Sequence, residues 1–150
     1  QTGVHPQMTG RENTRFIGRI NNVASLPEYE EKVQAFAELD KRFDLPVRTY
    51  SSGMRAKFVF ACCMNIDFDI YLIDEATSVG DPLFRKKAKA SLKEKSETAG
   101  VIMVSHELDQ IREFCTSTVI IDDGKLSYYA DLEEGIDVYT QDAANKKSLK

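Results

Sequence analysis

The chain has 150 residues, a net charge of −4, 42% hydrophobic and 29% charged residues, which is enough for one buried core. The negative net charge leaves no electrostatic footprint for nucleic acid, so we exclude nucleic-acid binding. No apolar run approaches the length of a membrane span. The three cysteines have no metal-binding spacing to the two histidines, and adjacent Cys62 and Cys63 indicate reduced core residues.

Residues 9–65 are predicted to be mainly helical. Thr9 and Glu12 form a capping-box pattern that opens a helix with Phe16, Ile17 and Ile20 on one face. Pro27 lies just inside the start of a second helix, whose apolar positions are Val33, Phe36, Ala37 and Leu39. Ser51, Ser52 and Gly53 then open a third helix with small side chains and bare backbone N–H groups, which together offer an anion site.

From residue 66 the pattern changes to alternating strands and helices. An apolar run in residues 69–75 ends in Asp74 and Glu75, which predicts a buried parallel strand. A helix begins at Asp81-Pro82, and Gly100 opens a second parallel strand that ends at Ser105. The remaining prediction is a short helix at 107–114, strands near 117–122 and 125–130 around a tight turn at Asp123-Gly124, a final helix, and a frayed polar tail from Gln141.

Polar side chains follow both predicted parallel strands. Ligands of such sheets bind at the carboxyl ends of the strands, where Asp74, Glu75 and His106 would lie. One carboxylate can hold Mg²⁺ through water while its neighbour orients or deprotonates an attacking water. A histidine at a strand end can reach a phosphate oxygen. Taken singly, each feature also fits a plainer structure: a solvated acidic loop, a helix N-cap, or a structural histidine.

In this order and spacing the segments resemble the ATP-binding-cassette (ABC) ATPases over nearly the whole chain. Residues 50–55 resemble the signature motif, with Ser52 and Met54 in place of its usual glycine and glutamine. Residues 70–75 resemble the Walker B strand with its catalytic glutamate, residues 78–81 the D-loop, and His106 the switch histidine.

Three segments narrow the resemblance to one branch of the family. Thr-Gly-Arg-Glu-Asn-Thr-Arg-Phe at 9–16, Tyr-Ser-Ser-Gly-Met at 50–54 and Ser-Val-Gly-Asp at 78–81 are similar to exporters of capsular polysaccharide, O-antigen and teichoic acid. The capsule branch fits best, given Val-Ser-His-Glu-Leu at 104–108 and the tail at 131–139.

The resemblance implies an α/β, P-loop NTPase-like cassette with parallel core strands. Residues 1–65 would be the helical subdomain with the signature motif, and residues 66–150 the C-terminal part of the α/β core. It implies ATP and Mg²⁺ as cofactors and a homodimer of ATPase subunits. The implied site residues are Glu75 and His106 for catalysis, Asp74 for the metal, and Ser51, Ser52, Gly53, Met54 and Asp81 for ATP across the dimer.

The resemblance also implies a partner and a location. The helical residues 13–22 would dock a membrane-spanning permease subunit. The protein would then be cytoplasmic and peripheral on the inner face of the cell membrane.

The largest departure from the family is the P-loop. A P-loop has the pattern Gly-x-x-x-x-Gly-Lys-Ser/Thr. The only Gly-Lys pair in the sequence is Gly124-Lys125, but Val119 stands where the first glycine is needed and Leu126 stands where the serine or threonine is needed. We therefore expect this chain to be a fragment of a longer protein. The full-length parent would hydrolyse ATP, whereas the fragment alone would be inactive. The alternatives are a degenerate, non-catalytic cassette that supports a partner, and an ABC ATPase for another substrate.

Overall fold

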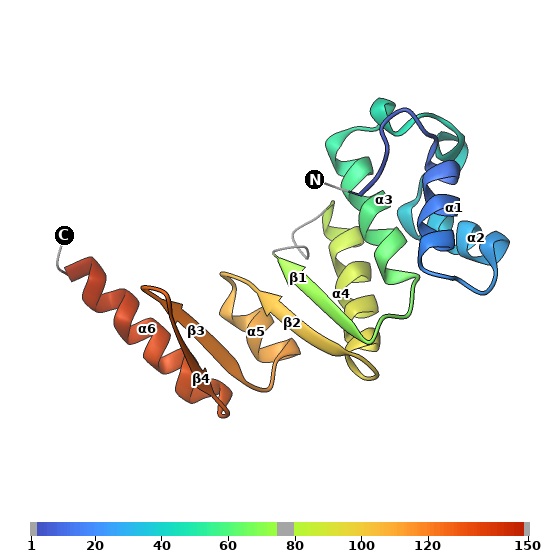
Figure 1. The fold of residues 1–150 in the computed structure, drawn as a ribbon. Helices are drawn as coiled ribbons and strands as arrows, with labels where there is room; N and C mark the ends of the chain where they lie inside the picture. Colours follow the sequence, from blue (N-terminus) through green and yellow to red (C-terminus); the bar gives the residue numbers. More distant parts are fainter. Residues whose placement is uncertain (1–2, 75–79, 149–150) are drawn as a thin grey trace. The chain divides into compact units, whose positions relative to one another are not determined.

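The computed structural model describes residues 3–74 and 80–148, with side chains as far as residue 142 (Figure 1). Its contacts divide the chain into two compact units. One comprises Gln1–Asp69 and Ala76–Ala99, and the other comprises Ile70–Glu75 and Gly100–Lys150. The boundary predicted between residues 65 and 66 separates a helical subdomain from the α/β core of the family, and it stays a prediction.

The first unit is a helical block. Its elements are α1 (Gly10–Ile20), α2 (Leu26–Ala37), the short 3₁₀ helices η1 (Asp40–Asp44) and η2 (Val47–Thr49), α3 (Ser52–Met64) and α4 (Pro82–Ser96). The predicted capping box at Thr9 and Glu12 is present, and Ser25 caps α2 just before Pro27. These helix starts are confirmed because each first turn has a side-chain acceptor for its otherwise unpaired N–H groups.

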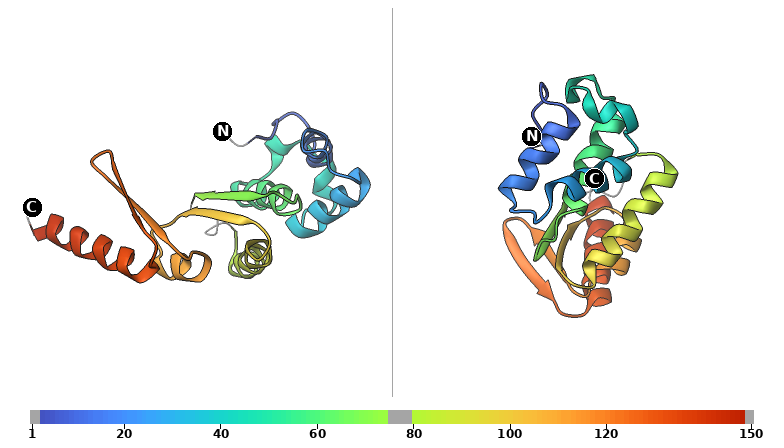
Figure 2. Two further views of the ribbon diagram at one scale, coloured as in Figure 1. Left: turned by 60° about the horizontal axis from the view of Figure 1, so that its bottom comes forward. Right: turned by 90° about the vertical axis from the view of Figure 1, so that its right-hand side faces the viewer.

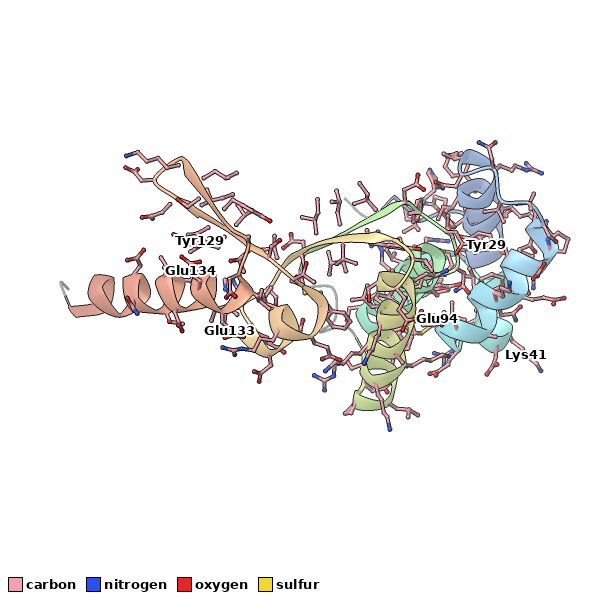
Figure 3. All side chains as sticks on the ribbon, turned by 90° about the horizontal axis from the view of Figure 1, so that it is seen from below. Tyr29, Lys41, Glu94, Tyr129, Glu133 and Glu134 are labelled. Atoms are coloured by element: carbon pink, nitrogen blue, oxygen red, sulfur yellow. The ribbon has the colours of Figure 1, made fainter. Side chains whose placement is uncertain are left out.

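Aromatic side chains fill the core of the helical block. Phe58 lies between Phe43 and Tyr50, with ring centroids 6.3 and 5.9 Å away in edge-to-face contact. Tyr29 lies among the helices (Figure 3) and donates from its hydroxyl to the Cys62 carbonyl at 2.8 Å. Burial raises the pKa of Tyr29, so this hydroxyl remains a hydrogen-bond donor.

Helix α1 buries a different face from the one its apolar residues suggest. Its buried residues are Gly10, Asn13, Thr14 and Gly18, whereas Phe16 is 51% and Ile20 62% exposed. The two glycines set this orientation: a Cβ on Gly10 would lie 2.9 Å from Phe43 Cδ2, and one on Gly18 would lie 3.0 Å from Tyr29 Cδ1. The helix is confirmed, but Phe16 and Ile20 of its predicted apolar face are exposed, and only Ile17 packs against the core.

The second unit contains both sheets. Strands β1 (Ile70–Asp74) and β2 (Gly100–Val104) are parallel and pair residue for residue from Ile70↔Gly100 to Asp74↔Val104 (Figure 2). Strands β3 (Thr118–Asp122) and β4 (Lys125–Tyr129) form an antiparallel hairpin, preceded by α5 (Leu108–Phe114). The predicted α/β class and both pairs of strands are confirmed, but the prediction that the first strand is buried is wrong on one face, because residues of β1 alternate between exposed and buried.

The hairpin turn and the final helix complete this unit. Asp123 and Gly124 both have positive φ, 46° and 74°, as a tight two-residue hairpin turn requires. Helix α6 (Leu132–Ser148) contacts β3 and β4. The frayed tail predicted from Gln141 is wrong, because the alanines, lysines and glutamine of this polar segment are adequate helix formers.

Apolar side chains on one side of the parallel sheet are open to solvent. Ile70 and Leu72 of β1 are 57% and 77% exposed, and Ile102 and Val104 of β2 are each 60% exposed. Over the described ranges, no helix combines the length and apolarity needed to cross a bilayer. The three cysteines are free thiols, as predicted, and Cys62 is a core residue. The prediction that Cys63 lies in the core is wrong, because its position on α3 turns it to the surface.

Candidate functional site

The register of the parallel strands brings two predicted site residues to one sheet edge. Asp74 is the last residue of β1 and pairs with Val104, the last residue of β2, so His106 follows at the same edge. Both Asp74 and His106 are exposed. Glu75 lies outside the described residues, as do residues 76–79, which include the first half of the predicted D-loop at 78–81.

The segment after β2 is held by its own hydrogen bonds. Ser105 Oγ accepts from the Glu107 backbone N–H at 3.0 Å. The Gln110 side chain donates to Glu107 Oε2 at 2.6 Å, which ties the start of α5 to this turn. His106 is therefore presented from a fixed turn at the carboxyl edge of the sheet.

A divalent cation at this edge would have few protein ligands. Among the residues with described side chains, no group of three or more histidine, cysteine or acidic side chains could hold a metal. Mg²⁺ commonly keeps several waters and takes one or two carboxylates together with substrate phosphates. The exposed carboxylate of Asp74 fits that role and does not form a closed metal site.

The start of α3 carries the predicted signature residues. Ser51 caps the helix by accepting from the Met54 N–H at 3.2 Å, and Ser51, Ser52 and Gly53 are exposed. Met54 packs against the core, and its sulfur accepts from Arg42 Nη1 at 3.1 Å. The expected helix start with accessible N–H groups is thus present.

Gly53 is a glycine that the fold does not require. A Cβ at this position would meet nothing within 4 Å, and the backbone is not in the left-handed region. Glycine inside a helix costs about 1 kcal/mol relative to alanine. Its presence here is consistent with close approach of another molecule to the helix start, which a Cβ would obstruct.

A depression of about 550 Å³ borders the same helix start. It is lined by Glu38, Leu39, Asp40, Lys41, Arg42 and Met54. Lys41 lies at the surface of the helical block (Figure 3). The mixed charges of this lining favour no single class of ligand.

Asp81 is fixed by two neighbours in the helical unit. It caps α4 by accepting from the Phe84 N–H at 3.0 Å, and its Oδ2 lies 2.6 Å from Lys57 Nζ on α3. The Lys57 ammonium, followed by the Phe84 N–H, lowers the pKa of Asp81 to about 2. Sequence reasoning missed Lys57, since no local pattern connects it to an aspartate so far along the chain.

Comparison with known proteins finds relatives of this chain. No protein-family model matches the chain. It is 40% identical over 141 residues to the polysialic acid transport ATP-binding protein KpsT of Escherichia coli, covering 91% of this chain and 62% of that protein. It is 36% identical to the capsule polysaccharide export ATP-binding protein CtrD of Neisseria meningitidis, covering 88% and 61%. The chain is a homologue of the ABC ATP-binding proteins of polysaccharide export.

Further comparisons give one more relative and one solved structure with a similar fold. The teichoic acids export ATP-binding protein TagH of Staphylococcus haemolyticus is 39% identical, with 93% of this chain and 54% of that protein covered. A solved ATP-binding subunit of an ABC transporter matches the fold with a TM-score of 0.70 at 24% identity, covering 83% of this chain and 55% of the other. The predicted resemblance and fold class are confirmed. The chain spans 62% of the length of KpsT.

Proposed function

We propose that this chain is part of the ATP-hydrolysing subunit of an ABC transporter that exports a cell-surface polysaccharide. The observation that carries the proposal is the shared sheet edge of Asp74 and His106, at the carboxyl ends of β1 and β2. That edge is where ligands of parallel sheets bind. The polysaccharide class of the cargo is supported by the names of the relatives.

Each residue at the sheet edge has a distinct role in this proposal. Phosphoryl transfer depends on positioning and charge stabilisation more than on covalent chemistry by the protein. Bound Mg-ATP supplies the phosphoryl group and the cation. Asp74 would hold Mg²⁺ through water, Glu75 would polarise the attacking water, and His106 would donate a hydrogen bond to a phosphate oxygen.

The start of α3 acts on nucleotide bound to a second subunit. Ser51, Ser52 and Gly53 offer exposed N–H and hydroxyl groups at a helix N-terminus, which favours phosphate. The open space at Gly53 supports a close approach. Met54 holds the helix start on the core, and Asp81 connects the two sites of the homodimer.

Helix α1 offers a surface for a membrane-spanning partner. Phe16 and Ile20 lie four residues apart on α1 and are 51% and 62% exposed. Apolar residues at this spacing form one face of a helix. We assign this face to the permease subunit, which places the protein in the cytoplasm at the inner face of the membrane.

The proposal is tested in a protein that contains this chain together with a P-loop. Glu75→Gln removes the negative charge and basicity but keeps the shape of the side chain. Turnover should fall by roughly the 10²–10⁴-fold typical of general-base removal, while ATP still drives dimerisation. Asp74→Asn should weaken nucleotide affinity and dimerisation together with turnover, because it alters the metal ligand.

Glu94→Gln is the matched control, since Glu94 is an exposed residue of α4 (Figure 3). It should leave turnover and dimerisation unchanged. Normal hydrolysis by Glu75→Gln would contradict the catalytic assignment of Glu75. Absence of hydrolysis by the unaltered protein would favour a cassette that supports a partner without catalysis.

A further inference from the structure

The ammonium group of Lys57 lies where three helices of the first unit meet. Lys57 belongs to α3, and its side chain is only 15% exposed. Its Nζ is 2.6 Å from Asp81 Oδ2, at the start of α4, and 3.1 Å from Glu38 Oε2, directly after α2. It also lies 5.0 Å from the centre of the Phe84 ring. The ammonium group of Lys57 therefore joins the end of α2, the start of α4, and α3, which we call the signature helix because residues 51–54 at its start resemble the signature motif.

Both carboxylates around Lys57 are held by further contacts. Glu38 adopts the left-handed conformation, with φ of 57°, and its Oε1 lies 3.8 Å from Lys87 Nζ. Asp81 caps α4, and it follows Gly80, whose φ of +83° and close packing on Phe84 leave no room for a Cβ. Because the Phe84 N–H already holds the carboxylate of Asp81, its ion pair with Lys57 loses little side-chain entropy when it forms.

The surroundings strengthen these ion pairs relative to exposed ones. Charge pairs screened from water by a low-exposure side chain interact more strongly than pairs in bulk solvent. An aromatic face beside the ammonium adds a favourable cation–π contact. Lys57 thus takes part in two ion pairs and one cation–π contact, and none of these contacts depends on bound nucleotide.

We infer that Lys57 is a positioning residue that ties Asp81 to the signature helix, so that Asp81 and residues 51–53 move as one body. The inference rests on the proposed function, in which both groups meet the second subunit of the dimer. A rigid connection between them would let the helix start and Asp81 engage that subunit in one step. Without it, each group would have to be ordered separately on dimerisation.

The first test concerns the ion pair and needs no nucleotide. Carbon-13 NMR of the aspartate carboxyls in the whole protein reports when Asp81 takes up a proton. In the wild type Asp81 should stay ionised near pH 3.8, since its pKa is about 2. In Lys57→Met, which keeps a long apolar stem without the charge, the pKa should rise toward 3.8. Lys57→Arg should keep it low.

A matched control removes a lysine elsewhere. Lys93 is exposed on α4, and Lys93→Met should leave the titration of Asp81 unchanged. An unaltered pKa of Asp81 in Lys57→Met would overturn the inference, whatever the protein catalyses.

The second test uses the ATPase reaction of the protein with its P-loop. Lys57→Met should lower kcat and ATP-driven dimerisation by roughly 10- to 100-fold, the size expected for misplacement of site groups. ATP binding to the separate subunit should stay unchanged, and Lys57→Arg should restore turnover. A role in stability alone would lower the melting temperature without this separation of binding from turnover.

The outcomes separate this inference from the proposed function. Wild-type turnover by Lys57→Met, together with an inactive Glu75→Gln, would refute the positioning role and leave the ATPase assignment standing. Wild-type turnover by both variants would refute the catalytic role of Glu75 as well, and a wild type without turnover would refute the ATPase assignment; in both cases the titration of Asp81 would still decide the ion pair.

Discussion

The Gly53→Ala substitution tests whether glycine at position 53 is required for the fold or for a binding partner. Gly53 is the second residue of α3, and an added Cβ would meet nothing within 4 Å. Alanine at a helical position that accommodates it stabilises a protein by about 0.4–1 kcal/mol, partly by restricting the unfolded chain. Because Gly53 lies in the first turn, we expect about 0.5 kcal/mol, seen as a melting temperature a few degrees higher.

Gly135→Ala is the contrasting substitution, because the same added methyl group should destabilise there. Gly135 of α6 is buried, and an added Cβ would collide with Thr118 Oγ1 and lie 3.1 Å from Tyr129 Cβ. Overpacking of this kind costs about 1–3 kcal/mol. Thr118→Ala should recover part of that loss by removing the colliding oxygen, whereas the isosteric Thr118→Val should not.

Two measurements complete the test of Gly53. Thermal unfolding of the chain shows whether each glycine-to-alanine substitution raises or lowers stability. Light scattering of the P-loop-bearing protein with Mg-ATP measures its dimerisation. Gly53→Ala should raise stability and impair dimerisation. A destabilised Gly53→Ala would contradict the open space at the start of α3. A stabilised variant that dimerises normally would refute close approach of a second subunit at this glycine.

Two further predictions concern nucleotide and acid. Calorimetry of the 150-residue chain should detect weak binding of Mg-ATP or none, because the P-loop normally supplies most phosphate contacts; tight binding would require a phosphate cradle elsewhere. Cations also lower the pKa values of Asp44, Asp67 and Asp81 in the folded protein. These carboxylates therefore stabilise the fold fully at a pH above their pKa values in the unfolded chain, and this stabilisation is lost as the pH falls through their pKa values in the folded protein. For Asp81 the loss should fall between about 3.8 and about 2, and Asp81→Asn should make acid destabilisation shallower; an unchanged pH profile in that variant would contradict it.

Much of the fold follows from local signals in the sequence. Thr9 with Glu12, Ser25 with Pro27, and Asp81 with Pro82 mark helix starts that the structure contains. Cap residues act within one turn, so their effect is readable without knowing the tertiary structure. The sheet edge is equally predictable, because parallel strands end together and expose the residues that follow.

Features that depend on distant contacts could not be predicted in this way. The apolar residues of α1 give its helical period, but the packing of Gly10 and Gly18 against Phe43 and Tyr29 decides which face is buried. Lys57 meets Asp81 only after α3 and α4 have packed together. In both cases the decisive partner lies far along the chain, where periodicity and spacing carry no information.

The segment at 9–16, which resembles polysaccharide exporters, is explained mostly by its fold. Asn13 is fully buried and donates to the carbonyls of His5, Met8 and Thr9 at 3.0, 3.2 and 2.9 Å. Arg11 reaches Asp44 at 2.7 Å and shares Glu30 with Arg15. Glu30 is 5% exposed, so losing one of its arginines would leave a poorly compensated buried charge.

Phe16 is the exception in that segment. Its large aromatic side chain is 51% exposed, and a Cβ at position 53 would likewise meet nothing within 4 Å. In the proposed function, the permease subunit accounts for Phe16 and a second ATPase subunit accounts for Gly53. Phe16 with Ile20, and Gly53 with Ser51, would then belong to two separate surfaces. The buried residues of α1 and the paired Lys57 hold these surfaces at fixed positions within the helical unit.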